Sequence, residues 1–155
     1  MQSNPSRVSL VLMACSGLKQ DVPAPAMDLY RGVMYQTYRA NVKPHAQPHV
    51  VILSARHGFI DPQGVIAPYD QRMTGTRADE ILAQLEAGCV LNATWPAALG
   101  SVLLAGGAQY RRVMRAALQW LADHRGIAPT SIAETHGGIG HQRSQLGAFL
   151  RGLPA

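Results

Sequence analysis

Residues 51–70, VILSARHGFIDPQGVIAPYD, begin as an apolar run and become polar within a few positions. A run of this kind, ending in side chains that hydrogen-bond and carry protons, is typical of a buried strand followed by a ligand-binding loop. The polar residues that could do chemistry here are Ser54, Arg56, His57, Tyr69 and Asp70. Asp61 is set apart, because Pro62 and Gly64 follow it and this pattern indicates a structural turn.

Asp70 is the candidate for catalysis in this stretch. It follows Pro68 and Tyr69, so a rigid, extended segment leads to a carboxylate beside an aromatic ring. A carboxylate can stabilise the positive charge that develops on a sugar during glycoside cleavage, and it can orient the attacking water. An aromatic ring can stack on a nucleobase. Tyr69 and Asp70 together therefore fit the cleavage of a bond between a sugar and a base.

Three more polar loops, at residues 14–30, 106–114 and 135–145, follow apolar runs. Each contains glycine, which lets a backbone approach a ligand closely. The side chains that these loops offer are Cys15, Ser16, Tyr110, Arg111, Arg112, His136, His141 and Arg143. Each loop also has a structural interpretation: a packed cysteine, a tight turn with solvated arginines, and a cap on the sheet. The sequence leaves these alternatives open.

The elements that must position these loops alternate along the chain. Short apolar runs predict strands at 8–13, 50–53, 101–105 and, more weakly, 131–136. Helical spacing of apolar residues predicts helices at 28–40, 81–89, 110–121 and 141–150. This order predicts a three-layer α/β/α fold with a short, mainly parallel central sheet of about four strands. Ligands bind beyond the carboxyl ends of such strands, so the polar loops are expected to meet there.

Length and charge narrow the class of protein. A chain of 155 residues indicates one domain spanning residues 1–155. Fourteen Lys and Arg against nine Asp and Glu give a net charge of +5. Most of the basic residues are Arg, whose guanidinium group pairs well with phosphate, so the charge favours a nucleic-acid partner. A basic protein without such a partner has the same composition, and the charge alone does not separate the two.

Several classes of site are disfavoured. Cys15 and Cys89 lie far apart in different kinds of segment, which argues against a disulfide framework or a metal site. Neither a Walker loop nor a GxGxxG motif follows the first strand, so no nucleotide cofactor is expected. The apolar run near the start is too short to span a membrane and lacks a secretion cleavage pattern. We therefore expect a cytoplasmic protein with no cofactor, metal or membrane partner.

Four segments together carry a family resemblance. They are CSGLKQDVPAPAMDLYRGVMYQTYRA, VILSARHGFIDPQGVIAPYD, LLAGGAQYRRV and GGIGHQRSQLGAFL, in that order. They resemble a small bacterial and phage domain that is related to the uracil-DNA-glycosylase-like fold and similar to the catalytic domain of archaeosine synthase. Small members also look like antiphage DNA glycosylases that remove glucosylated hydroxymethylcytosine from viral DNA. The chain departs from the family pattern at Gly17, where Lys is common, and at His141, where Lys or Arg is common.

The resemblance implies a DNA glycosylase that flips a modified base out of DNA and excises it, leaving an abasic site. Catalysis then falls to Asp70, helped by Asp28. Reading of the base falls to Cys15, Ser16, Tyr30, Ser54, His57 and Tyr69, with Tyr30 or Tyr69 stacking on it. Contacts to the nucleic-acid backbone fall to Lys19, Arg56, Arg111, Arg112, His136, His141 and Arg143.

Two other functions stay open. The same carboxylate could serve an N-glycosidase or base-exchange enzyme that acts on nucleotides or tRNA. The chain could also be a module that binds modified nucleic acid without chemistry, because the sequence contains no evident catalytic triad or metal site. The sequence also leaves open whether Lys19 forms a Schiff base with the abasic sugar.

Overall fold

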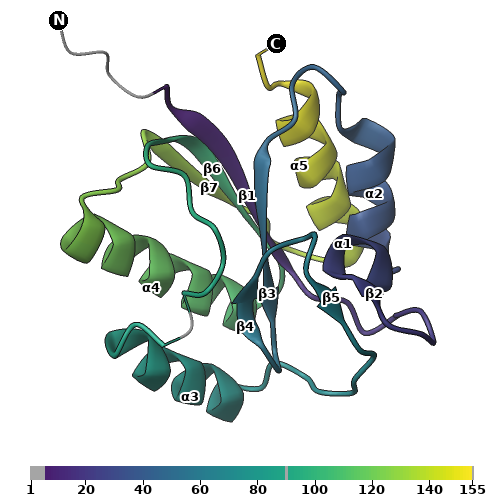
Figure 1. Cartoon of the computed structure of the whole chain (residues 1–155). Coiled ribbons are helices and arrows are strands. Elements are labelled where there is room, and N and C mark those ends of the chain that lie inside the picture. Colours follow the sequence, from purple (N-terminus) through teal and green to yellow (C-terminus); the bar gives the residue numbers. More distant parts are fainter. Residues whose placement is uncertain (1–5, 90, 155) are drawn as a thin grey trace, which may run out of the picture.

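The computed structural model describes residues 6–89 and 91–154 and contains one main sheet with helices on both faces (Figure 1). The sheet has five strands in the order β4-β3-β1-β6-β7. Four of them are parallel: β1 (Val8–Ala14), β3 (His49–Ser54), β6 (Leu99–Ala105) and β7 (Ser131–Glu134). The short strand β4 (Gly58–Ile60) runs antiparallel to β3. The expected three-layer, mainly parallel α/β/α fold is confirmed.

Two helical layers sandwich the sheet (Figure 1). Helices α3 (Gly75–Glu86) and α4 (Ala108–Arg125) pack together on one face. Helices α2 (Val33–Asn41) and α5 (Ile139–Arg151) pack together on the other, with the short helix α1 (Ala26–Leu29) on the same side. Along β1, Leu10 and Leu12 point into one core while Val11 and Met13 point into the other. Both faces of β1 are therefore buried, which explains its continuous apolar sequence.

Local differences from the predicted elements have identifiable causes. Strand β4 was not predicted, because its three residues lie within a polar stretch. The two-stranded sheet of β2 (Ala24–Pro25) and β5 (Val65–Ile66) is equally short and was also missed. The predicted helix at 28–40 is two helices, because Tyr30 is extended and pairs with Lys19 in a β-bridge, and Gly32 then begins α2.

The strand order creates a crevice at one place in the sheet. From β1 the chain passes to β3 on one side, and it then returns to β6 on the other side of β1. The helices that follow β1 and β6 consequently lie on opposite faces, and their starts diverge at the carboxyl ends of these two strands. In open α/β sheets, ligands bind at such a point.

One finding bears on membranes. Within the part of the chain that the structure describes, no helix combines the length and the apolar character needed to cross a bilayer.

Candidate functional site

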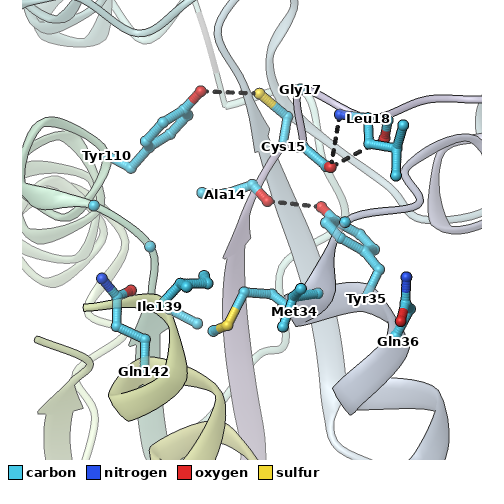
Figure 2. A pocket seen from close by; sticks show the side chains of 16 residues that line it. Ala14, Cys15, Gly17, Leu18, Met34, Tyr35, Gln36, Tyr110, Ile139 and Gln142 are labelled. Carbon is cyan, nitrogen blue, oxygen red and sulfur yellow. Dashed lines mark hydrogen bonds between the residues drawn. The ribbon is translucent and has the colours of Figure 1, made fainter. Parts of the chain in front are cut away.

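A pocket of about 480 Å³ lies at the carboxyl ends of β1 and β6 (Figure 2). Its walls come from residues 14–18 after β1, residues 105–107 after β6 and residues 32–36 at the start of α2. Tyr110 of α4 and two residues of α5, Ile139 and Gln142, complete it. We call this the β1–β6 pocket. It occupies the crevice that the strand order creates.

Glycines shape this pocket. A Cβ atom on Gly106 would lie 2.6 Å from the Cβ of Ala14, so only glycine lets the ends of β6 and β1 come this close. Helices α2, α4 and α5 each begin at a glycine, Gly32, Gly107 and Gly138, and none of these glycines supplies a side-chain cap. The first residues of α2 and the glycine before α4 line the pocket, and the first N–H groups of a helix have no partner within the helix.

Hydrogen-bonding side chains lie inside the pocket (Figure 2). The Sγ of Cys15 lies 3.1 Å from the hydroxyl of Tyr110, and it also accepts a backbone N–H from Ala55 at 3.5 Å. Tyr35 donates its hydroxyl to the carbonyl of Ala14 at 2.8 Å, which ties α2 to the end of β1. Burial, and then Cys15, raise the pKa of Tyr110, so its hydroxyl keeps its proton at neutral pH.

The mouth of the pocket is apolar. Leu18, Val33 and Ile139 line it and are 63%, 37% and 57% exposed. Exposed apolar side chains that gather around one opening often mark a site for a ligand or a partner. An apolar rim around a few hydrogen-bonding groups is typical of a site for a flat organic ligand.

A second cluster of polar residues lies on the other side of the β1 end, beside β3. The hydroxyl of Tyr69 lies 2.6 Å from that of Tyr30 and 2.7 Å from the Oγ of Ser54. Ser54 also accepts the backbone N–H groups of Arg56 and His57, at 3.2 and 3.0 Å. The ring of His57 meets the ring of Tyr69 edge-on, with centroids 5.4 Å apart. We call Tyr30, Ser54, His57 and Tyr69 the tyrosine cluster.

Burial controls the protonation of this cluster. It raises the pKa of Tyr30 to about 12, and burial followed by Cys15 raises that of Tyr69 as well. Burial and the nearby Arg56 lower the pKa of His57 below its usual range. At neutral pH the cluster is therefore uncharged. Two positive groups lie beside it: Arg56, next to His57, and Lys19, whose Nζ lies 4.5 Å from the centroid of the Tyr69 ring.

The predicted base-reading residues thus fall into two groups. Cys15 and Ser16 line the β1–β6 pocket. The hydroxyl of Ser16 already donates to the carbonyl of Leu18 and accepts the N–H of Leu18. The other four make up the tyrosine cluster. Tyr30 is fully buried, so the prediction that its ring stacks on a base is wrong. Tyr69 is only half-buried and keeps part of its ring accessible.

The two predicted catalytic carboxylates do not share a pocket. Asp70 is exposed and directly follows Tyr69 of the tyrosine cluster. Asp28 is exposed on α1, in a separate hollow with Arg31 and Arg39. Neither lines the β1–β6 pocket. The expected help of Asp28 to Asp70 consequently has no support in this arrangement.

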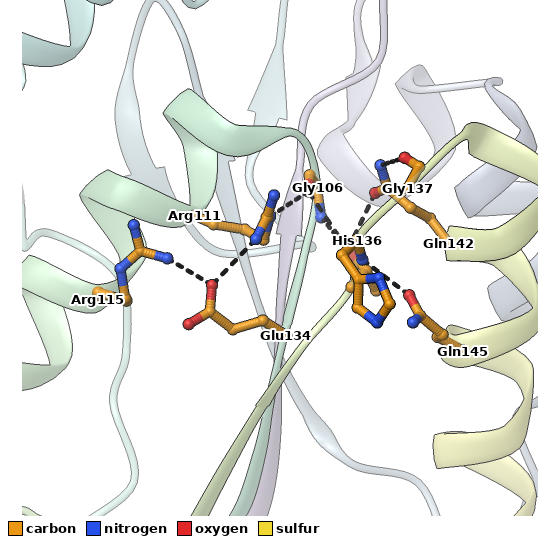
Figure 3. Close-up of polar contacts among 9 residues, drawn as sticks. Gly106, Arg111, Arg115, Glu134, His136, Gly137, Gln142 and Gln145 are labelled. Carbon is orange, nitrogen blue, oxygen red and sulfur yellow. Dashed lines mark hydrogen bonds and ion pairs between the residues drawn. The ribbon is translucent and has the colours of Figure 1, made fainter.

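The arginines of α4 have partners within the protein (Figure 3). Arg111 pairs with Glu134 at 3.3 Å and donates its Nε to the carbonyl of Gly106 at 3.0 Å. Arg112 pairs with Asp79 of α3. Both guanidinium groups are thus paired with carboxylates in this structure, and their contact with phosphate stays a prediction. Arg111 instead fixes the floor of the pocket at Gly106.

The remaining predicted backbone contacts are accessible. His136 and His141 are exposed at the start of α5, with ring centroids 5.0 Å apart. Arg143 is exposed one turn further along α5, and Arg56 is exposed after β3. Lys19 is half-buried above Tyr69. These residues stay free to meet a ligand.

One wall of the pocket was not predicted from the sequence. Residues 32–36 line it only because α2 begins at Gly32, whereas the sequence suggested a continuous helix from 28. Ile139 and Gln142 were not singled out either, although both lie in the polar loop predicted after the fourth strand; α5 begins at Ile139 and not near 141. The available signal was a glycine directly before each helical period, at Gly32, Gly107 and Gly138.

Among the residues that the structure describes, no group of three His, Cys, Asp or Glu side chains is placed to hold a metal ion.

Comparison with known proteins identifies the family to which the chain belongs. No curated protein and no solved structure matches the chain. Residues 10–144 match a family described as a family of unknown function, DUF6884, and this segment includes every residue that lines the β1–β6 pocket. The chain belongs to the DUF6884 family.

Proposed function

We propose that this protein is a DNA glycosylase that receives a flipped-out, modified base in the β1–β6 pocket. The observation that carries the proposal is the position of the pocket, at the crevice between the carboxyl ends of β1 and β6. Its volume of about 480 Å³ leaves room for a base that carries a substituent. Apolar side chains at the mouth would cover the faces of the base, and Cys15 and Tyr110 would meet its polar edge.

Asp70 is the residue that we assign to the chemistry. In the proposed reaction, water adds to C1′ of the sugar, the bond from C1′ to the base breaks, and the base leaves with a proton. The Asp70 carboxylate stabilises the positive charge that develops on the sugar and orients the water. Tyr69, held by hydrogen bonds to Ser54 and Tyr30, fixes the segment that leads to Asp70. The loop of residues 15–19 joins the pocket to this side, from Cys15 in the pocket to Lys19 above Tyr69.

The substrate follows from the family resemblance rather than from the pocket. Glucosylated hydroxymethylcytosine in phage DNA is the expected target, and its removal would leave abasic sites in an invading genome. Antiphage defence is then the biological role.

The test is base release from defined DNA. The purified protein is incubated with phage DNA that contains hydroxymethylcytosine, with the glucosylated form, and with unmodified DNA. Mass spectrometry then identifies released bases, and alkali cleavage maps abasic sites. We expect a free modified base and alkali-labile strands. Absence of release from all three DNAs contradicts the proposal. Borohydride trapping in the same reactions shows whether Lys19 forms a covalent adduct with the sugar.

One observation favours a second candidate, a module that binds modified DNA without cutting it. Neither Asp70 nor Asp28 lines the β1–β6 pocket, so the pocket itself supplies no carboxylate. This alternative predicts tight, modification-dependent binding and no released base. It also predicts that Asp70→Asn leaves binding unchanged and that no product forms with either protein.

A further inference from the structure

The two helical layers differ in their charges. The four ion pairs among the described residues all join residues of α3, α4 and β7. They link Arg77 to Glu80, Arg111 and Arg115 to Glu134, and Arg112 to Asp79. Acidic and basic groups therefore neutralise each other on this side of the sheet.

Helices α2 and α5 of the opposite layer contain no such compensation. Neither α2 nor α5 contains an Asp or Glu, and the longer stretches 29–60 and 135–155 contain none either. The two helices carry Arg39, Arg143 and Arg151, all of them exposed, together with His141. Along α2 and α5 an anionic partner therefore meets arginines and no carboxylate. The Asp28 carboxylate of the same layer lies on α1, in the separate hollow with Arg31 and Arg39.

A groove runs between these two helices. It has a volume of about 410 Å³ and is lined by Gln36 and Asn41 of α2 and by Arg143, Ser144 and Arg151 of α5. Val33 and Gln36 line both this α2–α5 groove and the β1–β6 pocket. The groove consequently starts at the mouth of the pocket and leads away from it along the basic layer.

The two groove arginines are spaced for a nucleic-acid strand. Eight residues separate Arg143 from Arg151, which corresponds to about 12 Å along α5 at a rise of about 1.5 Å per residue. Phosphates along one strand of duplex DNA repeat every 3.4 Å of helix axis, roughly, so the two guanidinium groups span about three to four nucleotides. Arg151 donates one nitrogen to the Oδ1 of Asn41 at 2.6 Å, and this contact holds the side chain in the groove.

We propose that the α2–α5 groove binds the phosphate backbone of the DNA strand that carries the base in the pocket. This inference rests on the proposed glycosylase function and names the surface that grips its substrate. It places the main backbone contacts on Arg143 and Arg151, and it removes them from the arginines of α4. The partner is DNA because the groove continues into the pocket proposed for a nucleobase.

The test compares two double variants with the same loss of charge. Arg143→Gln/Arg151→Gln removes the groove charges, and Arg115→Gln/Arg125→Gln removes two charges from α4 on the opposite layer. Binding of a fluorescent duplex is measured by anisotropy at several salt concentrations. Each lost phosphate contact lowers the slope of log K against log salt by about 0.9. We expect a drop of about 1.8 for the groove variant and little change for the α4 variant.

Single variants and other ligands keep the test decisive. Arg143→Gln alone should lower the slope by about 0.9, and circular dichroism checks that each variant folds. Equal drops for both double variants would show a general charge effect and overturn the groove. A drop seen with tRNA but not with duplex DNA would overturn DNA as the occupant. If the wild-type protein releases a base and the groove variant binds DNA as tightly as wild type, the proposed role of the groove is wrong while the glycosylase proposal stands.

Discussion

Two regions flank the end of β1, and they differ in packing: one contains an open pocket and the other is filled by side chains. On the β6 side, glycines and helix starts surround an open pocket with an apolar mouth. On the β3 side, the hydroxyls of Tyr30, Tyr69 and Ser54 satisfy one another and fill the space. Residues 51–70, the segment richest in reactive residue types, thus contribute to a packed cluster beside the pocket. The pocket itself lies where the chain has glycines and other small residues. Chemical groups and space for a ligand come from different parts of the sequence.

Cys15 connects the two regions. Its Sγ contacts Tyr110 of the pocket and accepts the N–H of Ala55, which follows β3. The comparison is therefore testable by substitutions placed on one side at a time. Substitutions in the β1–β6 pocket should change substrate binding. Substitutions at the tyrosine cluster and Asp70 should change the stability of the fold or the rate of the chemical step.

The largest effect is expected at Asp70, next to the tyrosine cluster. Asp70→Asn removes the negative charge that stabilises the sugar cation, and base release should slow by about 10²-fold or more. The free energy of unfolding should change by less than about 0.5 kcal/mol, because Asp70 is exposed. Single-turnover release and thermal unfolding measure the two quantities. Asp28→Asn is the control, and a larger loss there than at Asp70 would reverse the assignment.

The next effect concerns the pocket floor. Gly106→Ala places a Cβ 2.6 Å from that of Ala14 and should lower the free energy of unfolding by about 1 to 3 kcal/mol. Gly107→Ala adds the same atom where no other atom lies within 4 Å, and its effect should stay within about 0.5 kcal/mol. Urea unfolding of both variants measures the difference. Equal stabilities would mean that the ends of β1 and β6 are not tightly apposed.

A pH dependence tests the buried hydroxyls. Tyr30 holds its proton to about pH 12 in the folded state, whereas an unfolded tyrosine loses it near pH 10. The folded chain therefore binds more protons in this window, and the free energy of unfolding falls as pH rises from 10 to 12. Tyr30→Phe should make this fall less steep, by up to about 1.4 kcal/mol per pH unit.

The control for this pH series is the same variant at pH 7. There, Tyr30→Phe should cost only about 1 kcal/mol, the value of one buried hydrogen bond. Denaturant unfolding at several pH values gives both numbers. A fall of unchanged steepness in the variant would mean that Tyr30 titrates as it does in an unfolded chain.

The smallest effect is expected from a single hydroxyl in the pocket. Tyr110→Phe removes the partner of the Cys15 Sγ and one group that could meet the base. We expect KM to rise several-fold with kcat nearly unchanged, because one neutral hydrogen bond contributes about 0.5 to 1.5 kcal/mol. Steady-state release assays separate the two constants. A fall in kcat with KM unchanged would move Tyr110 from base binding to the chemical step.

The sequence predicted the main elements well for a physical reason. Strands β1, β3 and β6 are buried on both faces or nearly so, and burial of that kind produces continuous apolar runs. The position of the site also followed, because the carboxyl ends of parallel strands collect the loops. Whether the chain has a uracil-DNA-glycosylase-like fold stays a prediction.

Features that depend on distant partners could not be predicted. The pairing of Arg111 with Glu134 and of Arg112 with Asp79 joins residues 23 and 33 positions apart. Tyr30 was offered with Tyr69 for stacking because the sequence does not show that Tyr30 is fully buried, with its ring beside those of Tyr35 and Tyr69. The wall formed by Gly32 and Gln36 was missed for a similar reason, since the break before α2 depends on the β-bridge between Lys19 and Tyr30.

If the base enters the β1–β6 pocket, a bulky side chain placed in that pocket must block its release. Gly107 and Gly138 each precede a helix, and each has open space where a Cβ would be added. Of the two, only Gly107 lines the pocket. Release of modified base is measured for wild-type, Gly107→Phe and Gly138→Phe proteins. We expect Gly107→Phe to abolish release and Gly138→Phe to retain it. Full release by Gly107→Phe would contradict the claim and place the base elsewhere.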